Sequence, residues 1–116
     1  MNINCEEHRS AVVLSLEGDC TCEEVDALRR VLQPYLERRD LSLVVDGRAL
    51  SSIDSAGLEA FLQVADELRA MSGRLCLAGF SGDALASFQL TRLDRRFDMR
   101  STIEEAARSV SMGEVA

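Results

Sequence analysis

The segment from Leu41 to Val45 is the sequence feature that most constrains the fold. Four of its five residues are apolar, which is typical of a short strand covered on both faces of a sheet. Such a strand needs helices above and below it. The chain offers them on either side, because apolar residues recur at helical spacing from Val25 to Leu36 and from Leu58 to Leu68. An α/β fold is therefore predicted.

The remaining elements follow from the same periodicities. Further strands are predicted at 3–7, 11–17, 74–80 and 97–100, and further helices from Ala84 to Leu93 and from Ile103 to Val110. The resulting order is β-β-α-β-α-β-α-β-α. Strands that alternate with helices after a starting hairpin imply a mixed, mostly parallel sheet flanked by about four helices.

Polar residues and glycines predict where these elements end. Gly18 to Thr21 is expected to break the second strand, and Asp46-Gly47 the central one. Gly73 is expected to close the second long helix in the left-handed conformation. Pro34 predicts a bend or an early end in the first helix, because proline removes a backbone hydrogen bond.

Two capping boxes predict helix starts. Thr21 with Glu24 precedes the first helix, and Ser101 with Glu104 precedes the last one. In this pattern the hydroxyl and the carboxylate each satisfy a free amide of the first turn.

The length and the net charge of the chain limit the functions that it could have. A chain of 116 residues fits one domain, predicted as residues 1–110 with a frayed tail at 111–116. The formal net charge of −7 with five aromatic residues disfavours nucleic-acid binding, which needs a basic face and stacking rings. No apolar run approaches the roughly 18 residues that span a bilayer, and no signal segment is evident. A cytoplasmic protein without direct membrane insertion is expected.

The basic residues exclude several kinds of site. All 13 are arginine, so Schiff-base chemistry and a P-loop are ruled out. A phospho-acceptor receiver domain is also excluded, although Asp46 occupies a position at the end of an apolar strand like its acceptor. That pattern needs a lysine and a paired acidic cluster.

The cysteines do not predict a disulfide or a metal site. Cys5 with His8 and Cys20 with Cys22 carry zinc-ligand side chains, but the Cys-x-Cys spacing is tighter than the usual two to four intervening residues. Cys76 lies among apolar neighbours and is interpreted as a small buried residue.

The stretch SSIDSAGLEAFL, from Ser51 to Leu62, places Asp54 and Ser55 directly before a helical pattern. A nucleophile elbow would need a glycine where Ile53 stands, and His8 is the only histidine that could serve as a base. Either residue could cap the helix. Capping does not explain Gly57, because glycine is a poor helix former. A glycine there would instead permit a close approach to the start of the helix. Capping alone and a functional helix terminus both remain open.

At this point the residues resemble the signature of STAS domains. An apolar strand ending in Asp46 is followed by Ile53-Asp54-Ser55-Ala56-Gly57-Leu58 and an amphipathic helix. The pattern is most similar to the bacterial anti-sigma factor antagonists. The likeness extends over nearly the whole chain, from the break at Gly18 to the ending at 97–110.

This resemblance implies a partner switch. In the family, the motif serine is phosphorylated by an anti-sigma factor that is also a serine kinase with a histidine-kinase-like ATPase fold, and a PP2C-type phosphatase reverses the modification. Ser55 would be the phosphorylated residue. Contacts with partners would come from Asp19, Thr21, Ile53, Asp54, Ala56, Gly57 and Leu58. ATP, magnesium and the phosphatase metal would belong to the partners, so this chain would hold no cofactor and would not be an enzyme.

Two alternatives are ranked below this one. Another STAS branch serves as a subunit of lipid-transport ATPases or of multi-STAS signalling assemblies, but it usually lacks the Asp-Ser pair. A serine hydrolase ranks last, because Ser55 has no evident base. The sequence does not identify the downstream target or the oligomeric state.

Overall fold

A computed structural model describes residues 1–9 and 11–115, and the side chains of 1–9 and 11–110. Its strands are β1 (Asn2–Glu7), β2 (Val12–Cys20), β3 (Ser42–Ile53), β4 (Arg74–Ala78) and β5 (Asp98–Arg100). Its helices are α1 (Val25–Leu36), α2 (Ser55–Ala70), α3 (Gly82–Leu90) and α4 (Ile103–Val115), with a short 3-10 helix η1 (Leu93–Arg95). The element order confirms the prediction. Fraying of 111–116 stays a prediction.

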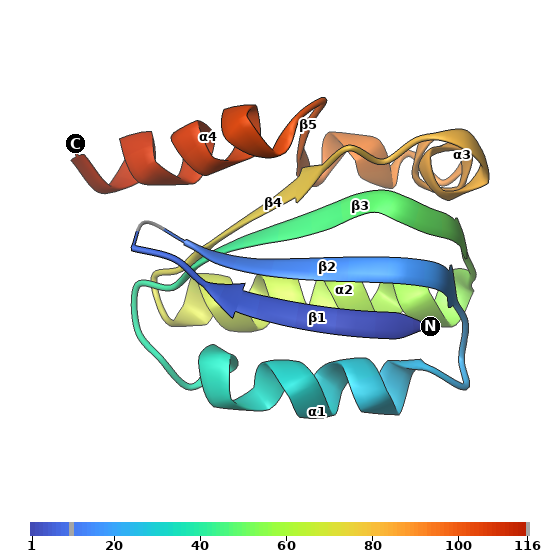
Figure 1. The fold of residues 1–116 in the computed structure, drawn as a ribbon, viewed down its shortest axis with the longest axis horizontal. Coiled ribbons are helices and arrows are strands. Elements are labelled where there is room, and N and C mark those ends of the chain that lie inside the picture. Colours follow the sequence, from blue (N-terminus) through green and yellow to red (C-terminus); the bar gives the residue numbers. More distant parts are fainter. Residues whose placement is uncertain (10, 116) are drawn as a thin grey trace.

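The sheet has the order β1-β2-β3-β4-β5. β1 and β2 pair antiparallel, and each later neighbour is parallel, so the predicted mixed sheet is confirmed. Figure 1 shows α1 and α2 on one side of the sheet and α4 on the other, with α3 near the end of β3. Within the described residues, no helix is long and apolar enough to cross a membrane.

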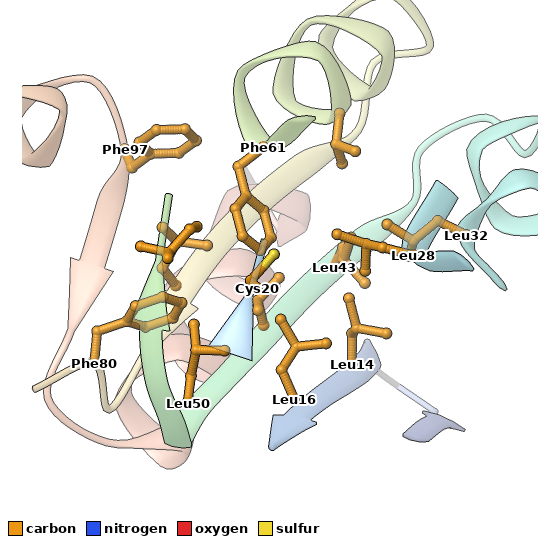
Figure 2. Close-up of a cluster of buried hydrophobic side chains, with 14 of the residues drawn as sticks. Leu14, Leu16, Cys20, Leu28, Leu32, Leu43, Leu50, Phe61, Phe80 and Phe97 are labelled. Atoms are coloured by element: carbon orange, nitrogen blue, oxygen red, sulfur yellow. The ribbon is translucent and has the colours of Figure 1, made fainter. Parts of the chain in front are cut away.

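The central run from Leu41 to Val45 packs on both faces of the sheet, as predicted. Leu43 and Val45 belong to the larger core under α1 and α2, whereas Val44 belongs to a smaller one with Ala106 and Val110 of α4. Figure 2 shows the larger core, in which Phe61 of α2 points toward the sheet beside Cys20. Apolar side chains thus cover both faces of β3.

Both predicted strand ends were wrong. β3 continues past Asp46-Gly47 to Ile53, and β2 continues past Gly18 to Cys20. Gly47 is needed for packing, because an added Cβ would lie 2.4 Å from the Phe80 ring. Gly18, with φ of +104°, lies where the register between β2 and β3 shifts, so it marks a bulge. The two extensions pair with each other and carry the chain to the start of α2.

Both capping boxes were also wrong. The Glu24 amide donates to the Thr21 carbonyl at 2.9 Å, so a turn precedes α1, whose N-cap is Glu24 without a side-chain bond. At α4 the cap is one residue later than predicted, since Thr102 Oγ1 accepts from the Glu105 amide at 3.1 Å. Ser101 has no such role.

The ends of α1 and α2 agree with the predictions in position, whereas α3 ends at Leu90 rather than Leu93 and α4 continues past Val110 to Val115. α1 ends at Leu36, two residues after Pro34. After α2, Ser72 rather than Gly73 adopts the left-handed conformation, with φ of 61°. Gly73 is the next residue, and its amide donates to the Leu68 carbonyl at 2.7 Å. A Cβ there would lie 2.7 Å from the Leu41 carbonyl oxygen, so this glycine serves a close approach.

Candidate functional site

Asp54 connects three segments at the start of α2. It is the N-cap residue, and its Oδ1 accepts a hydrogen bond from the Gly57 amide at 2.9 Å. Its Oδ2 accepts from the Cys22 amide at 3.0 Å, and its own amide donates to the Cys20 carbonyl at 3.0 Å. Both carboxylate oxygens therefore have partners within the chain, which ties the segment after β2 to α2.

Ser55 is the first residue of α2, and it is exposed. No hydrogen bond to its hydroxyl is present in the described part of the chain. The first intrahelical bond runs from the Leu58 amide to the Asp54 carbonyl, so the amides of Ser55 and Ala56 lie at the positive end of the helix dipole. The prediction that one of these two residues caps the helix is thus confirmed for Asp54. Ser55 has no capping role.

Gly57 brings α2 against the ends of β2 and β3. An added Cβ would lie 2.6 Å from Ile53 Cγ1 and 2.9 Å from the Cys20 carbonyl oxygen. Gly57, Ile53 and Leu58 are all buried. The close approach that the glycine allows is therefore internal, and these three residues hold the site in place. Their direct contact with a partner stays a prediction.

Asp19 lies at the end of the sheet where β3 leads to Ser55. It pairs with Ser52 across β2 and β3, and its Oδ1 accepts from the Ser52 hydroxyl at 2.6 Å. Asp19 is exposed, whereas Thr21 and Ala56 are half-buried. The structure thus brings the predicted contact residues together at one end of the sheet. This happens because both strands run beyond their predicted ends.

Ser87 of α3 was missed by sequence reasoning. Its hydroxyl lies within hydrogen-bond distance of the Ile53 carbonyl, at 3.2 Å, and of the Asp83 carbonyl, at 3.1 Å. It therefore links α3 to the last residue of β3, directly before Asp54. No sequence signal reveals this contact, because helical spacing does not indicate which face of α3 meets β3.

Asp46 is a buried carboxylate that is already paired. Arg48 donates to it from Nε at 3.1 Å, from Nη2 at 3.0 Å and from its backbone amide at 3.1 Å. Burial raises the pKa of Asp46, but these hydrogen bonds outweigh it and leave the pKa below the ordinary value. This carboxylate has the properties of a structural ion pair.

Ser55 has no histidine base nearby. His8 follows β1 next to Val12, the first residue of β2, whereas Ser55 follows β3 next to Cys20, the last residue of β2. The eight residue steps between those two positions of β2 correspond to roughly 26 Å. His8 lies instead 3.3 Å from Glu6. The arrangement does not support acyl transfer through Ser55.

The cysteines do not gather. No group of three His, Cys, Asp or Glu residues that could hold a metal ion occurs among the described residues. Burial raises the pKa of the Cys20 thiol to about 11 and that of Cys76 to about 12. Both thiols are therefore protonated at neutral pH, which is typical of packing residues.

Comparisons with known proteins agree with this fold. The family model of the STAS domain matches residues 2–106. Among curated proteins, no sequence matched significantly. An anti-sigma factor antagonist from Mycobacterium paratuberculosis is similar in structure, with a TM-score of 0.84, 22% identity and coverage of 94% of this chain and 92% of that chain.

The protein SpoIIAA is similar in both of its forms. Its unphosphorylated form, an anti-sigma factor antagonist, gives a TM-score of 0.74 at 23% identity, over 97% of this chain and 99% of that chain. Its phosphorylated form, a Bacillus cell fate determinant, gives 0.71 at 26% identity, over 99% and 100%. Because the family model covers nearly the whole chain, this protein belongs to the STAS domain family.

Proposed function

We propose that this protein is a phosphoregulated anti-sigma factor antagonist. In its unphosphorylated form it binds and sequesters an anti-sigma factor that is also a serine kinase. Phosphorylation of Ser55 releases that partner, and a PP2C-type phosphatase restores the binding form. The proposal rests chiefly on one observation, an exposed and unbonded serine hydroxyl at the N-terminus of α2, beside a capping aspartate. The antagonist neighbours, including a phosphorylated one, support it.

The fold can carry a phosphate at this position. Phosphorylation would add about 1.5 to 2 negative charges, and the helix dipole and free amides of the first turn favour anions there. Asp54 already has partners for both oxygens, so the cap has no need to rearrange. The modified protein should therefore keep its native structure.

The same charge disfavours a bound partner. Neither Asp19 nor Asp54 pairs with an arginine within the described residues, so no ion pair offsets the negative charge of either carboxylate. In a closed interface the phosphate would have to be desolvated next to these carboxylates. Desolvation and repulsion together can cost several kcal/mol, and each 1.4 kcal/mol is about tenfold in affinity. Binding can thus be lost without unfolding.

The partners would supply the cofactors for both the phosphorylation and the dephosphorylation of Ser55. The kinase would supply ATP and magnesium, and the phosphatase its own divalent metal. Here the Ser55 hydroxyl is the acceptor, and Asp54 fixes the helix end that presents it. This chain acts in the proposal as substrate and ligand.

Phosphate mapping tests the proposal. The protein is incubated with its cognate kinase and ATP, and the modified residue is identified by mass spectrometry. The expected result is one phosphate on Ser55, none in S55A, and normal modification in S51A, a matched control at another exposed serine. Modification elsewhere, or none with a kinase of verified activity, would refute it.

A further inference from the structure

β1 lies at one edge of the sheet (Figure 1), and β5 lies at the other. Native edge strands are usually protected from a further strand by shortness, a bulge, proline or charge, above all lysine. β5 is protected by its length of three residues. β1 has six residues, NINCEE, and pairs with β2 without a register shift. Only its two glutamates protect it, so β1 offers a regular edge.

The pairing of β1 with β2 determines which backbone groups of β1 point outward. The His8 amide donates to the Ala11 carbonyl at 2.9 Å, so these two residues form a hydrogen-bonded pair of the antiparallel ladder. Such pairs alternate with pairs that exchange no hydrogen bond. Ile3, Cys5 and Glu7 therefore direct both amide and carbonyl away from β2, and no group of the described residues bonds to them there. This is the regular pattern that a further strand needs.

Partly covered apolar side chains border this edge. Ile3 and Cys5 of β1 are half-buried and pack against the larger core, as do Val31 and Tyr35 of α1. Tyr35 also lies against the Cys5 thiol. These four residues form an apolar strip beside β1 that the chain itself covers only in part. A strand added to β1 would cover more of it.

We propose that two copies of this protein pair through β1, as antiparallel strands about a two-fold axis at Cys5. In this register Cys5 faces Cys5 of the second copy, and Ile3 faces Glu7. These are the residues whose backbone groups point outward, so each of those groups gains a partner. Opposed residues point to the same face of a sheet. The apolar strips of the two copies would therefore lie side by side.

The charges of β1 fit a second copy in this register. Glu6 faces Asn4 and Glu7 faces Ile3, so no carboxylate meets another. Glu7 is also paired with Arg38. A register shifted by two residues would leave outward groups unpaired, and in one direction it would oppose Glu6 to Glu6, which is unfavourable. The edge is therefore self-complementary in one register, as a two-fold interface requires.

Sedimentation velocity of the full chain, from micromolar to millimolar concentration, tests this pairing. A reversible monomer–dimer equilibrium is expected. E7P should weaken the dimer about tenfold or more, because proline removes the outward amide of residue 7 and leaves the bonds to β2 intact. E7A is the matched control. It loses the same ion pair with Arg38 but keeps the amide, so it should dimerise like the wild type.

Two substitutions of the exposed residue Asn4 test the register, and they keep the test decisive if circular dichroism shows that E7P does not fold. N4E places a carboxylate opposite Glu6 of the second copy and should weaken the dimer, whereas N4R should strengthen it. A chain that stays monomeric at millimolar concentration, or a dimer that E7P and N4E leave unchanged, would overturn the proposal.

Hydrogen exchange distinguishes a second copy from another occupant of the edge. The amides of Ile3, Cys5 and Glu7 should exchange slowly in concentrated protein and quickly in dilute protein. Protection of these amides only in the presence of the partner kinase would assign the edge to that protein and overturn the self-pairing. S55A should dimerise like the wild type, because β3, which leads to Ser55, does not pair with β1. Failure of this proposal therefore leaves the role of Ser55 untouched.

Discussion

Replacing Gly57 with alanine tests how closely the start of α2 must approach the strands beneath it. The new Cβ would lie 2.6 Å from Ile53 Cγ1, 2.9 Å from the Cys20 carbonyl oxygen and 3.0 Å from Cys20 Sγ. The carbonyl cannot move aside easily, because it also accepts from the Asp54 amide. Relief would therefore require a shift of α2 away from β2.

The expected magnitude follows from two opposing terms. Overpacking of this kind costs about 1 to 3 kcal/mol, and alanine recovers up to about 1 kcal/mol of helix propensity. A net loss of about 1 to 2 kcal/mol should lower the melting temperature by roughly 4 to 8 °C in a domain of this size. Thermal unfolding followed by circular dichroism measures it.

Gly82 provides a matched control. It has φ of +55° and nothing within 4 Å of an added Cβ, so G82A adds backbone strain of about 1 kcal/mol without a clash. G57A should also slow phosphorylation of Ser55, since the helix start moves, whereas G82A should not. A G57A protein as stable as the wild type would refute the packing argument.

Three further predictions concern the cap, an ion pair and the thiols. D54A should lose about 1 to 2 kcal/mol of stability, typical of a missing N-cap, and denaturant unfolding checks it. Asp46 has a folded pKa below its unfolded value because of Arg48. Its contribution to the stability of the folded state is therefore present above the unfolded pKa near 4 and is lost as the pH falls through the folded pKa. Unfolding curves measured between about pH 6 and 2 should therefore show a loss of stability at acid pH, and this loss should be smaller in the variant R48Q. At pH 8 a thiol reagent should label exposed Cys22 quickly and buried Cys76, whose pKa is about 12, only after unfolding.

The periodicity of apolar residues predicted the architecture because burial on one or two faces is a local property of the sequence. Leu43 and Val44, for example, pack on opposite faces as the run implies. The strand ends failed for the opposite reason. Asp46 and Gly47 are typical of a turn, but Arg48 pairs with the carboxylate and the Phe80 ring packs on the glycine. Those partners come from tertiary structure, which local propensity does not contain.

The candidate site, like the fold, was predicted from the sequence only in part. Asp54 and Ser55 were placed correctly at a helix start, because cap residues carry a local signature. Gly57 indicated a close approach, but its partners, Ile53 and Cys20, depend on the extension of two strands that had been predicted to end earlier. Ser87 had no signal at all, since its contact depends on how α3 lies against β3.

The central claim is that charge on Ser55 controls binding without unfolding the domain. The most direct measurement compares unphosphorylated and Ser55-phosphorylated protein, both for affinity to the partner kinase and for melting temperature. Affinity should fall at least about tenfold, the equivalent of 1.4 kcal/mol, while the two melting temperatures stay within a few degrees. Equal affinities, or a loss of affinity that accompanies unfolding, would contradict the account.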